Sequence, residues 1–310
     1  MKRVLVTPRS LTSAGHPALD HLRAAGFDVL YCTPGKLPDE LELSSLLPGC
    51  VGWLAGVEPV SDKVIEAAPQ LRAISRNGVG TDNLPLQIIQ QRGIKVCTAD
   101  GANASGVAEL AIGLMFASLR HIHTANTGIK AGQWPRNQGT EIRGQTVGII
   151  GCGAIGREVA RLACALDCHV IGFDPMQPDL GLPAERFKWA SIDELLEQAT
   201  LISLHCPPPR DGSPLIGAAQ LARMADGTIL INTARASLVD EVAIIAALDS
   251  GRLTAYATDV FKEEPPKSLT LASHPKVIAT SHIGGFTTQS VNRATEIAVA
   301  NLLTALRGEG

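Results

Sequence analysis

The feature that most constrains the fold is a short stretch in the middle of the chain, where an apolar run leads into a glycine pattern. Residues 146–156 read TVGIIGCGAIG, which places Gly151, Gly153 and Gly156 in the spacing GxGxxG. A bare GxGxxG also occurs by chance in ordinary glycine-rich turns. Here the apolar run predicts a strand before the glycines, and a helical pattern follows them. This order is typical of a dinucleotide-binding α/β domain.

Each position of this motif has a physical role in holding a dinucleotide. Gly151 permits a tight turn, Gly153 lets the backbone approach a pyrophosphate, and Gly156 lets the helix pack closely on the strand. The helix N-terminus presents N–H groups and a partial positive charge to the phosphates. Asp174 ends the next apolar run, where it can accept hydrogen bonds from ribose hydroxyls and would repel a 2′-phosphate. The sequence therefore predicts NAD, in preference to NADP, as the cofactor.

Short apolar runs alternate with helical patterns along most of the chain, as in parallel sheets covered by helices. With 310 residues, of which 45% are hydrophobic, the chain can form two domains with buried cores. Strands are expected at 4–6, 29–31, 52–54, 73–75 and 95–97 in the first domain, and at 146–150, 169–173, 201–205, 228–233, 256–260 and 277–281 in the second.

Helical patterns lie between these runs. Ser61 is a plausible N-cap, and Ser191 with Glu194 forms a capping-box signature. The more polar stretch 122–145 is expected to be a helix end and a loop. Helices are expected at 62–68, 103–121, 154–166, 191–198, 241–250 and 288–307.

Charge and cysteine content exclude several classes of protein. A net charge of -3 and a pI near 6.2 argue against a nucleic-acid-binding protein or a basic membrane-surface protein. The seven cysteines include no pair with CxxC spacing, so we expect reduced thiols, no metal site and a cytoplasmic location. No apolar run reaches the length of a signal peptide or a transmembrane segment. Any attraction for an anionic substrate must therefore be local.

Three polar residues, Arg235, Glu264 and His282, come just after the last three expected strands. Because the carboxyl ends of parallel strands meet at one edge, these side chains are expected in one crevice. Arg235 can hold a carboxylate through two parallel hydrogen bonds. His282 can exchange the proton of a hydroxyl group, and Glu264 can orient the imidazole and keep it protonated. These groups suit hydride transfer between NAD and a 2-hydroxy acid.

Taken singly, each of these residues has a structural explanation, namely a surface ion pair, a satisfied histidine or a solvated turn. Their occurrence together, after a dinucleotide fingerprint, favours a catalytic set. His205 also ends an expected strand and is expected to lie near the cofactor.

Further motifs extend over nearly the whole chain. They are SRNGVGTDN at 75–83, VAEL at 107–110, GTEIRG at 139–144, LHCP at 204–207, NTAR at 232–235, DVFKEEP at 259–265 and SHIGG at 281–285. On these motifs the sequence resembles the D-isomer-specific 2-hydroxyacid dehydrogenase family, particularly its phosphoglycerate dehydrogenase branch.

The resemblance implies an α/β fold, with a Rossmann dinucleotide-binding domain and a smaller flavodoxin-like substrate domain, both built on doubly wound parallel sheets. The substrate domain is expected to be discontinuous, with residues 1–98 and 287–310, and the NAD-binding domain to cover residues 99–286. Two long helices that connect the domains are expected to form much of a homodimer interface.

The resemblance also implies roles for individual residues. Arg235, Glu264 and His282 are expected to form the catalytic set, and Asp259 to lie by the nicotinamide carboxamide. The loop Asn77–Val79 is expected to hold the substrate carboxylate through backbone N–H groups. The expected cofactor residues are Gly151, Gly153, Ala154, Ile155, Gly156, Asp174, Pro175, His205, Cys206, Pro207, Thr233, Ala234, Asp259 and Gly284, and the expected substrate residues are Arg76, Asn77, Gly78, Val79, Arg136, Arg235 and His282.

The substrate itself is less constrained. Arg76 and Arg136 match positions that hold the phosphate in phosphoglycerate dehydrogenases, whereas a further Arg expected near Ala55 is absent. The predicted function is hydride transfer between NAD and C2 of a small anionic D-2-hydroxy acid or its 2-keto partner. A hydroxypyruvate or glyoxylate reductase is the alternative among enzymes. A dinucleotide-sensing interaction protein, like the corepressors related to this family, is the alternative from another class.

Overall fold

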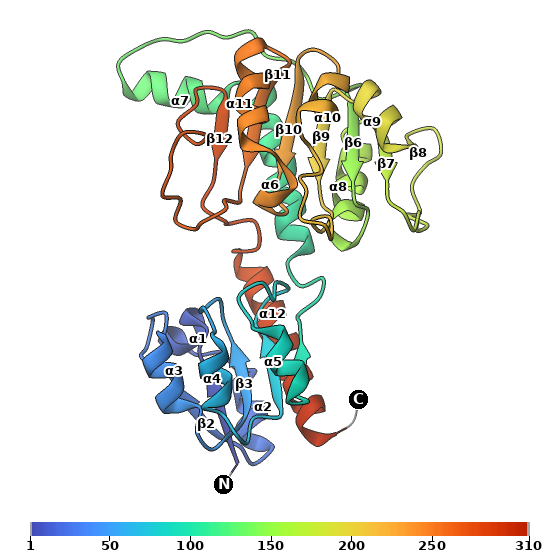
Figure 1. Ribbon diagram of the computed structural model, residues 1–310. Coiled ribbons are helices and arrows are strands. Elements are labelled where there is room, and N and C mark those ends of the chain that lie inside the picture. The colour runs from blue at the N-terminus through green and yellow to red at the C-terminus, as the bar shows by residue number, and fades with distance from the viewer. Residues whose placement is uncertain (1, 309–310) are drawn as a thin grey trace. The chain divides into compact units, whose positions relative to one another are not determined.

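A computed structural model describes residues 2–308 of the chain (Figure 1). The chain divides into two compact units. The first contains the residues up to Asn103 together with those from Thr287 onward, and the second runs from Ala104 to Phe286. The first unit is therefore discontinuous in sequence. Within residues 2–308, none of the helices is both long and apolar enough to cross a membrane.

The first unit is built on a parallel sheet of five strands in the order β2-β1-β3-β4-β5. This is the flavodoxin-like order, in which ligands bind beyond the carboxyl ends of the strands. Every residue of β3 is buried, which explains its nearly continuous apolar sequence. The strands are β1 (Arg3–Val6), β2 (Asp28–Tyr31), β3 (Cys50–Ala55), β4 (Ala73–Arg76) and β5 (Lys95–Cys97).

Helices cover both faces of this sheet and bury two apolar cores. One core contains Leu43, Val64 and Ile89, which come from the three helices of one face. The other core joins Val4 of β1 to Leu302 of the last helix. The final segment of the chain thus completes the core of the first unit. The helices of the first face are α3 (Glu40–Leu46), α4 (Asp62–Glu66) and α5 (Leu86–Gln91), and those of the second are α1 (Arg9–Ala14), α2 (Leu19–Ala24) and α12 (Thr288–Arg307).

The second unit is built on a parallel sheet of seven strands in the order β12-β11-β10-β9-β6-β7-β8. The chain moves outward from β6 to β8 and then returns to β9 on the other side of β6. A dinucleotide binds at such a reversal in Rossmann folds. The strands are β6 (Thr146–Ile150), β7 (His169–Phe173), β8 (Phe187–Trp189), β9 (Leu201–Leu204), β10 (Thr228–Asn232), β11 (Leu253–Thr258) and β12 (Val277–Ala279).

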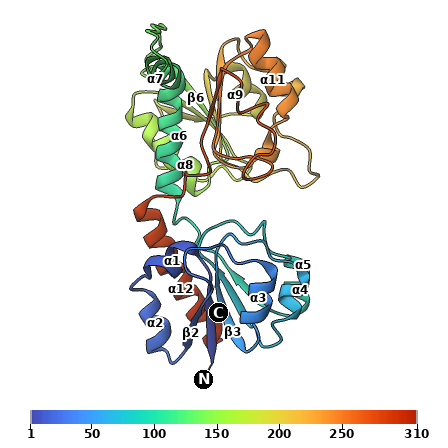
Figure 2. The ribbon, with the colours of Figure 1, turned by 90° about the vertical axis from the view of Figure 1, so that its left-hand side faces the viewer.

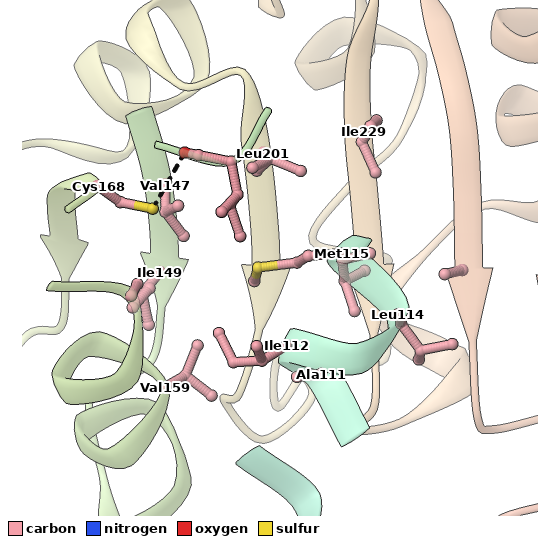
Figure 3. Packing of buried hydrophobic residues seen from close by; sticks show 14 of the residues in the cluster. Ala111, Ile112, Leu114, Met115, Val147, Ile149, Val159, Cys168, Leu201 and Ile229 are labelled. Carbon is pink, nitrogen blue, oxygen red and sulfur yellow. Dashed lines mark hydrogen bonds between the residues drawn. The ribbon is translucent and has the colours of Figure 1, made fainter. Parts of the chain in front are cut away.

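Two layers of helices enclose this sheet (Figure 2). α6 (Ala104–Leu119) and α8 (Ala154–Ala165) lie side by side on one face. Figure 3 shows Ile112 and Met115 of α6 against Val147 and Leu201 of the strands. The other face is covered by α9 (Ile192–Gln198), α10 (Ala218–Arg223) and α11 (Glu241–Ser250). All seven cysteines of the chain are free thiols.

The α/β class, both parallel sheets and most elements agree with the sequence analysis. The capping box is confirmed, since Ser191 Oγ accepts from Glu194 N and Glu194 Oε2 accepts from Ser191 N. Several details differ from the prediction. The start of the stretch 122–145 is a separate helix, α7 (Ile122–Lys130), and β8 and α10 were not predicted. Ser61 precedes α4, but its side chain caps no helical N–H.

Buried and exposed valines of the second unit provide a test of the core. Val147 of β6 is fully buried, whereas Val242 of α11 is 77% exposed. Val147→Ala is expected to lower the free energy of unfolding by about 2 kcal/mol, because two buried methyl groups are lost and a cavity remains. Val242→Ala is the matched control and should change it by less than about 0.5 kcal/mol. Equal losses in urea-unfolding experiments would contradict this packing.

Candidate active site

The three candidate catalytic residues follow neighbouring strands of the seven-stranded sheet. β10, β11 and β12 lie next to one another and are parallel, so their carboxyl ends share one edge. Arg235 follows β10, Glu264 follows β11 and His282 follows β12. The fold therefore brings these segments, which are far apart in sequence, to the same edge of the second unit.

Glu264 and His282 are in direct contact. Glu264 Oε2 lies 2.7 Å from His282 Nδ1, and both side chains are partly exposed. The other carboxylate oxygen, Oε1, accepts a hydrogen bond from the backbone N–H of Phe261 at 3.0 Å. Glu264 is thus held from its own loop while it fixes the imidazole. This contact orients the ring and leaves Nε2 as the nitrogen available for proton exchange.

Asp259 holds the loop that carries His282. Its side chain is 2% exposed. Asp259 Oδ1 accepts from Thr280 Oγ1 at 2.6 Å and from Ile283 N at 2.9 Å, and Oδ2 accepts from Gly284 N at 2.8 Å. His282, between these contacts, has a positive φ of 55°. Sequence reasoning placed Asp259 beside the cofactor and missed this anchoring contact, together with the part of Thr280 in it.

Arg235 lies on a turn that a buried asparagine supports. Asn232, the last residue of β10, is fully buried. Its Oδ1 accepts from Ala234 N at 3.1 Å, and its Nδ2 donates to the carbonyl oxygen of Arg235 at 2.9 Å. The guanidinium of Arg235 donates to Ala234 O at 2.8 Å, and its side chain is partly exposed. Asn232, at the end of β10, therefore fixes the backbone that carries the Arg235 side chain.

The glycine motif forms the turn between β6 and α8. Gly151 has a φ of 90°, and a Cβ there would lie 2.7 Å from the backbone of His205 and Cys206. A Cβ on Gly156 would lie 1.9 Å from the carbonyl oxygen of Gly151. Gly153 is different, because a Cβ there would meet nothing within 4 Å. Gly153 therefore leaves open space at the helix N-terminus.

Asp174 lies beside this turn. Its Oδ2 accepts from the backbone N–H of Cys152 at 2.8 Å, and its Oδ1 accepts from Met176 N at 2.9 Å. Burial, with a further contribution from Asp174, raises the pKa of the Cys152 thiol to about 12. Cys152 is thus a protonated, buried side chain. The Asp174 carboxylate lies at the carboxyl end of β7.

Two buried polar atoms at the same edge have no partner among the described residues. They are Nδ1 of His205, after β9, and Oγ1 of Thr233, after β10. His205 Nε2 lies 2.8 Å from Ser203 Oγ, and burial lowers the pKa of His205 to about 3, so its ring is neutral. Within residues 2–308, no side chain caps the N-terminus of α8. Unpaired polar atoms beside an uncapped helix N-terminus fit a bound dinucleotide with a pyrophosphate.

The other expected cofactor residues lie around the same turn and strand ends. They are half-buried or exposed, except Gly284. Gly284 is buried, and its backbone N–H donates a hydrogen bond to Asp259 Oδ2. These residues are Ala154 and Ile155 at the start of α8, Pro175 after β7, Cys206 and Pro207 after β9, Ala234 after β10, and Gly284 after β12.

The expected substrate residues fall in both units. Arg76 is the last residue of β4 in the first unit and is 4% exposed, and the loop Asn77–Val79 follows it. The backbone N–H of Asn77 donates to Ala55 O at 2.8 Å. The N–H groups of Gly78 and Val79 have no partner within residues 2–308, so these two remain available to an anion. Arg136 lies in the second unit, where it lines a cavity of about 660 Å³ with Arg120 and His121.

Residues 112–284 match the profile of the D-isomer specific 2-hydroxyacid dehydrogenase family, NAD binding domain. The chain belongs to this family. It is 40% identical to a hydroxypyruvate reductase of Thermotoga maritima over 239 residues, which are 76% of this chain and 77% of that protein. It is 39% identical to a D-3-phosphoglycerate dehydrogenase of Methanocaldococcus jannaschii over 253 residues, 81% of this chain but only 48% of that longer protein.

A solved glyoxylate reductase from Paecilomyes thermophila has the same fold, with a TM-score of 0.84 and 28% identity, over 98% of this chain and 95% of that one. The family membership confirms the prediction of an NAD-dependent oxidoreductase of D-2-hydroxy acids. Membership of this family also identifies NAD as the cofactor. The glycine turn and the unpaired polar atoms can accommodate it.

The glycine motif provides a matched pair of variants. Gly156→Ala is expected to lower the free energy of unfolding by at least about 3 kcal/mol, because its Cβ would overlap a backbone oxygen. Gly153→Ala should leave stability nearly unchanged, since that Cβ meets open space. It should weaken NADH binding on the order of tenfold, because the backbone can no longer approach the pyrophosphate. Urea unfolding measures the effect on stability, and NADH fluorescence titration measures the effect on binding. A stable Gly156→Ala variant and a Gly153→Ala variant that unfolds more easily but binds NADH normally would contradict the roles given to these glycines.

Proposed function

We propose that this protein reduces a small 2-keto acid to the D-2-hydroxy acid, and catalyses the reverse oxidation, with Arg235, Glu264 and His282 as its catalytic residues. The observation that carries the proposal is the 2.7 Å contact between Glu264 Oε2 and His282 Nδ1, on strand ends adjacent to that of Arg235. NADH, when bound, supplies the hydride that C2 receives.

Each of the three side chains has one task. The guanidinium of Arg235 binds the substrate carboxylate and thereby holds the 2-keto group in a fixed orientation. In reduction, His282 donates the proton from Nε2 to the oxygen on C2 as negative charge develops there. Glu264 acts on Nδ1, where its charge stabilises the protonated imidazole. In oxidation the same nitrogen of His282 accepts the hydroxyl proton.

The remaining site residues support this chemistry without moving protons. Asp259 keeps His282 in place through the loop contacts, and Asn232 does the same for the backbone of Arg235. The free N–H groups of Gly78 and Val79, in the first unit, suit a second set of contacts to a carboxylate. Arg136 is proposed as a contact for a substrate phosphate, if the substrate carries one.

His282→Ala tests the proposal directly. It is expected to lower kcat for reduction of hydroxypyruvate or glyoxylate by roughly 10²–10⁴-fold, because the proton donor is lost. NADH binding, followed by fluorescence titration, should change little. The matched control is His169→Ala, an exposed histidine at the amino end of β7, the opposite end of the same sheet. Full turnover in His282→Ala, or equal losses in both variants, would rule out His282 as the acid.

We also propose that the protein works as a homodimer in the cytoplasm. The second unit exposes a group of apolar side chains on α7 and the loop after it, with Ile122 52%, Ile129 52% and Trp134 79% exposed. Such a group is typical of a protein interface. Seven unpaired cysteines suit a reducing compartment. Sedimentation at micromolar concentration should give twice the chain mass, and Ile129→Asp should yield monomers, whereas a monomeric wild type would refute the dimer.

A further inference from the structure

A buried tyrosine that the proposed mechanism does not use lies in the strand next to the one that Arg235 follows. Tyr256, in β11, is 1% exposed. Its ring belongs to the apolar core on the face of the sheet that α9, α10 and α11 cover. Its hydroxyl group forms hydrogen bonds with Asn232 and Thr258, which are both fully buried. A polar group is therefore held inside the core, where a lost hydrogen bond cannot be replaced by water.

The hydroxyl group of Tyr256 completes the hydrogen bonding of the asparagine that supports Arg235. The amide nitrogen of Asn232 carries two hydrogen atoms. It donates to Arg235 O at 2.9 Å and to Tyr256 Oη at 3.4 Å, while Asn232 Oδ1 accepts from Ala234 N at 3.1 Å. Tyr256 thus accepts the amide hydrogen that the turn does not use. Without the tyrosine hydroxyl, a buried N–H group of Asn232 would lose its partner.

The same hydroxyl group is fixed from its own strand. Thr258 Oγ1 donates to Val260 O at 3.0 Å and accepts from Val260 N at 3.2 Å. Because the Thr258 hydroxyl has only one hydrogen, it accepts the hydrogen bond that it shares with Tyr256. The chain of hydrogen bonds therefore has one direction, from Asn232 through Tyr256 to Thr258. This direction fixes the rotation of the tyrosine hydroxyl and presents its lone pairs to Asn232.

From this geometry we propose that Tyr256 is a positioning residue for the substrate carboxylate, which acts through Asn232 on the backbone of Arg235. Its side chain is buried in the core, so it acts through the asparagine and not by contact with a substrate. A guanidinium binds a carboxylate most strongly when two parallel N–H groups meet the two oxygens, so a small displacement of the turn weakens the contact. The inference rests on the proposed function and adds a residue to its binding of the 2-keto acid.

The contacts that hold His282 do not use the tyrosine hydroxyl. Asp259 holds the loop that carries His282, and Glu264 contacts the imidazole. Loss of the Tyr256 hydroxyl should therefore disturb substrate binding more than proton transfer. All of these residues belong to the second unit, so the effect is transmitted within one compact body.

The test is Tyr256→Phe in the whole chain, which removes one oxygen atom and keeps the ring in the core. KM for hydroxypyruvate, at saturating NADH, should rise by about five- to tenfold, because the Arg235 turn loses its support. kcat should change by less than about twofold, since the proton donor stays in place. NADH affinity, measured by fluorescence titration, should not change. A wild-type KM in a variant with a native circular dichroism spectrum would overturn the inference.

Tyr31→Phe is the matched control, because it makes the same change at the other tyrosine of the chain. Tyr31 ends β2, an edge strand of the first unit, and its hydroxyl accepts from Arg23 Nη2 at 2.6 Å. This variant should keep the wild-type KM. An equal rise of KM in both variants would show a general effect of losing a tyrosine hydroxyl and would also overturn the inference.

A double-mutant cycle separates a positioning role from a general loss of stability. In an Arg235→Lys background, Tyr256→Phe should raise KM by less than about twofold more, because the planar guanidinium through which it acts is gone. If the two changes multiply in full, Tyr256 acts on some other part of the fold and the proposal is refuted.

The outcomes distinguish this inference from the proposed function. Turnover by the wild type, together with an unchanged KM in Tyr256→Phe, would overturn the inference alone. No turnover of any 2-keto acid by the wild type, or a wild-type KM in Arg235→Lys, would overturn the proposed function.

Discussion

One buried carboxylate determines where the imidazole of the candidate active site lies. Asp259 accepts hydrogen bonds from Thr280, Ile283 and Gly284, and it is almost completely shielded from water. In such a place an unpaired carboxylate would be costly, so the loop must close on it. Closure leaves His282 where its Nδ1 meets Glu264. The pairing of these two partly exposed groups is therefore a consequence of a contact made inside the protein.

Much of this arrangement can be predicted from the sequence, because the signals are local. The spacing of Gly151, Gly153 and Gly156 specifies a strand, a turn and a helix, and the structure shows atomic reasons for the first and last of them. Alternation of apolar runs and helices specifies parallel sheets. Once the strands are parallel, residues that follow strands must gather at one edge, which places Arg235, Glu264 and His282 together.

The parts that could not be predicted depend on contacts between distant residues. β8 is a three-residue edge strand whose pairing with β7 leaves no periodic pattern in so short a segment. α7 is polar enough to resemble a loop. The burial of Arg76 and its bonds to Ala55 and Gly80 are equally invisible, because a motif gives the residue type but not its partners. A sequence motif thus identifies which residues belong to the site. Only the tertiary structure shows whether a charged side chain there is available to a ligand or already bonded within the protein.

The backbone of His282 has a further consequence for how this protein can change over time. A residue with a φ of 55° adopts a left-handed conformation that glycine accepts freely and most side chains resist. At this position folding alone would favour glycine, whereas the proton transfer that we propose for His282 needs an imidazole. At His282, selection for greater thermal stability would therefore favour glycine, whereas selection for turnover would favour histidine. A lineage released from the need for catalysis would be expected to lose this histidine early, with little harm to the rest of the fold.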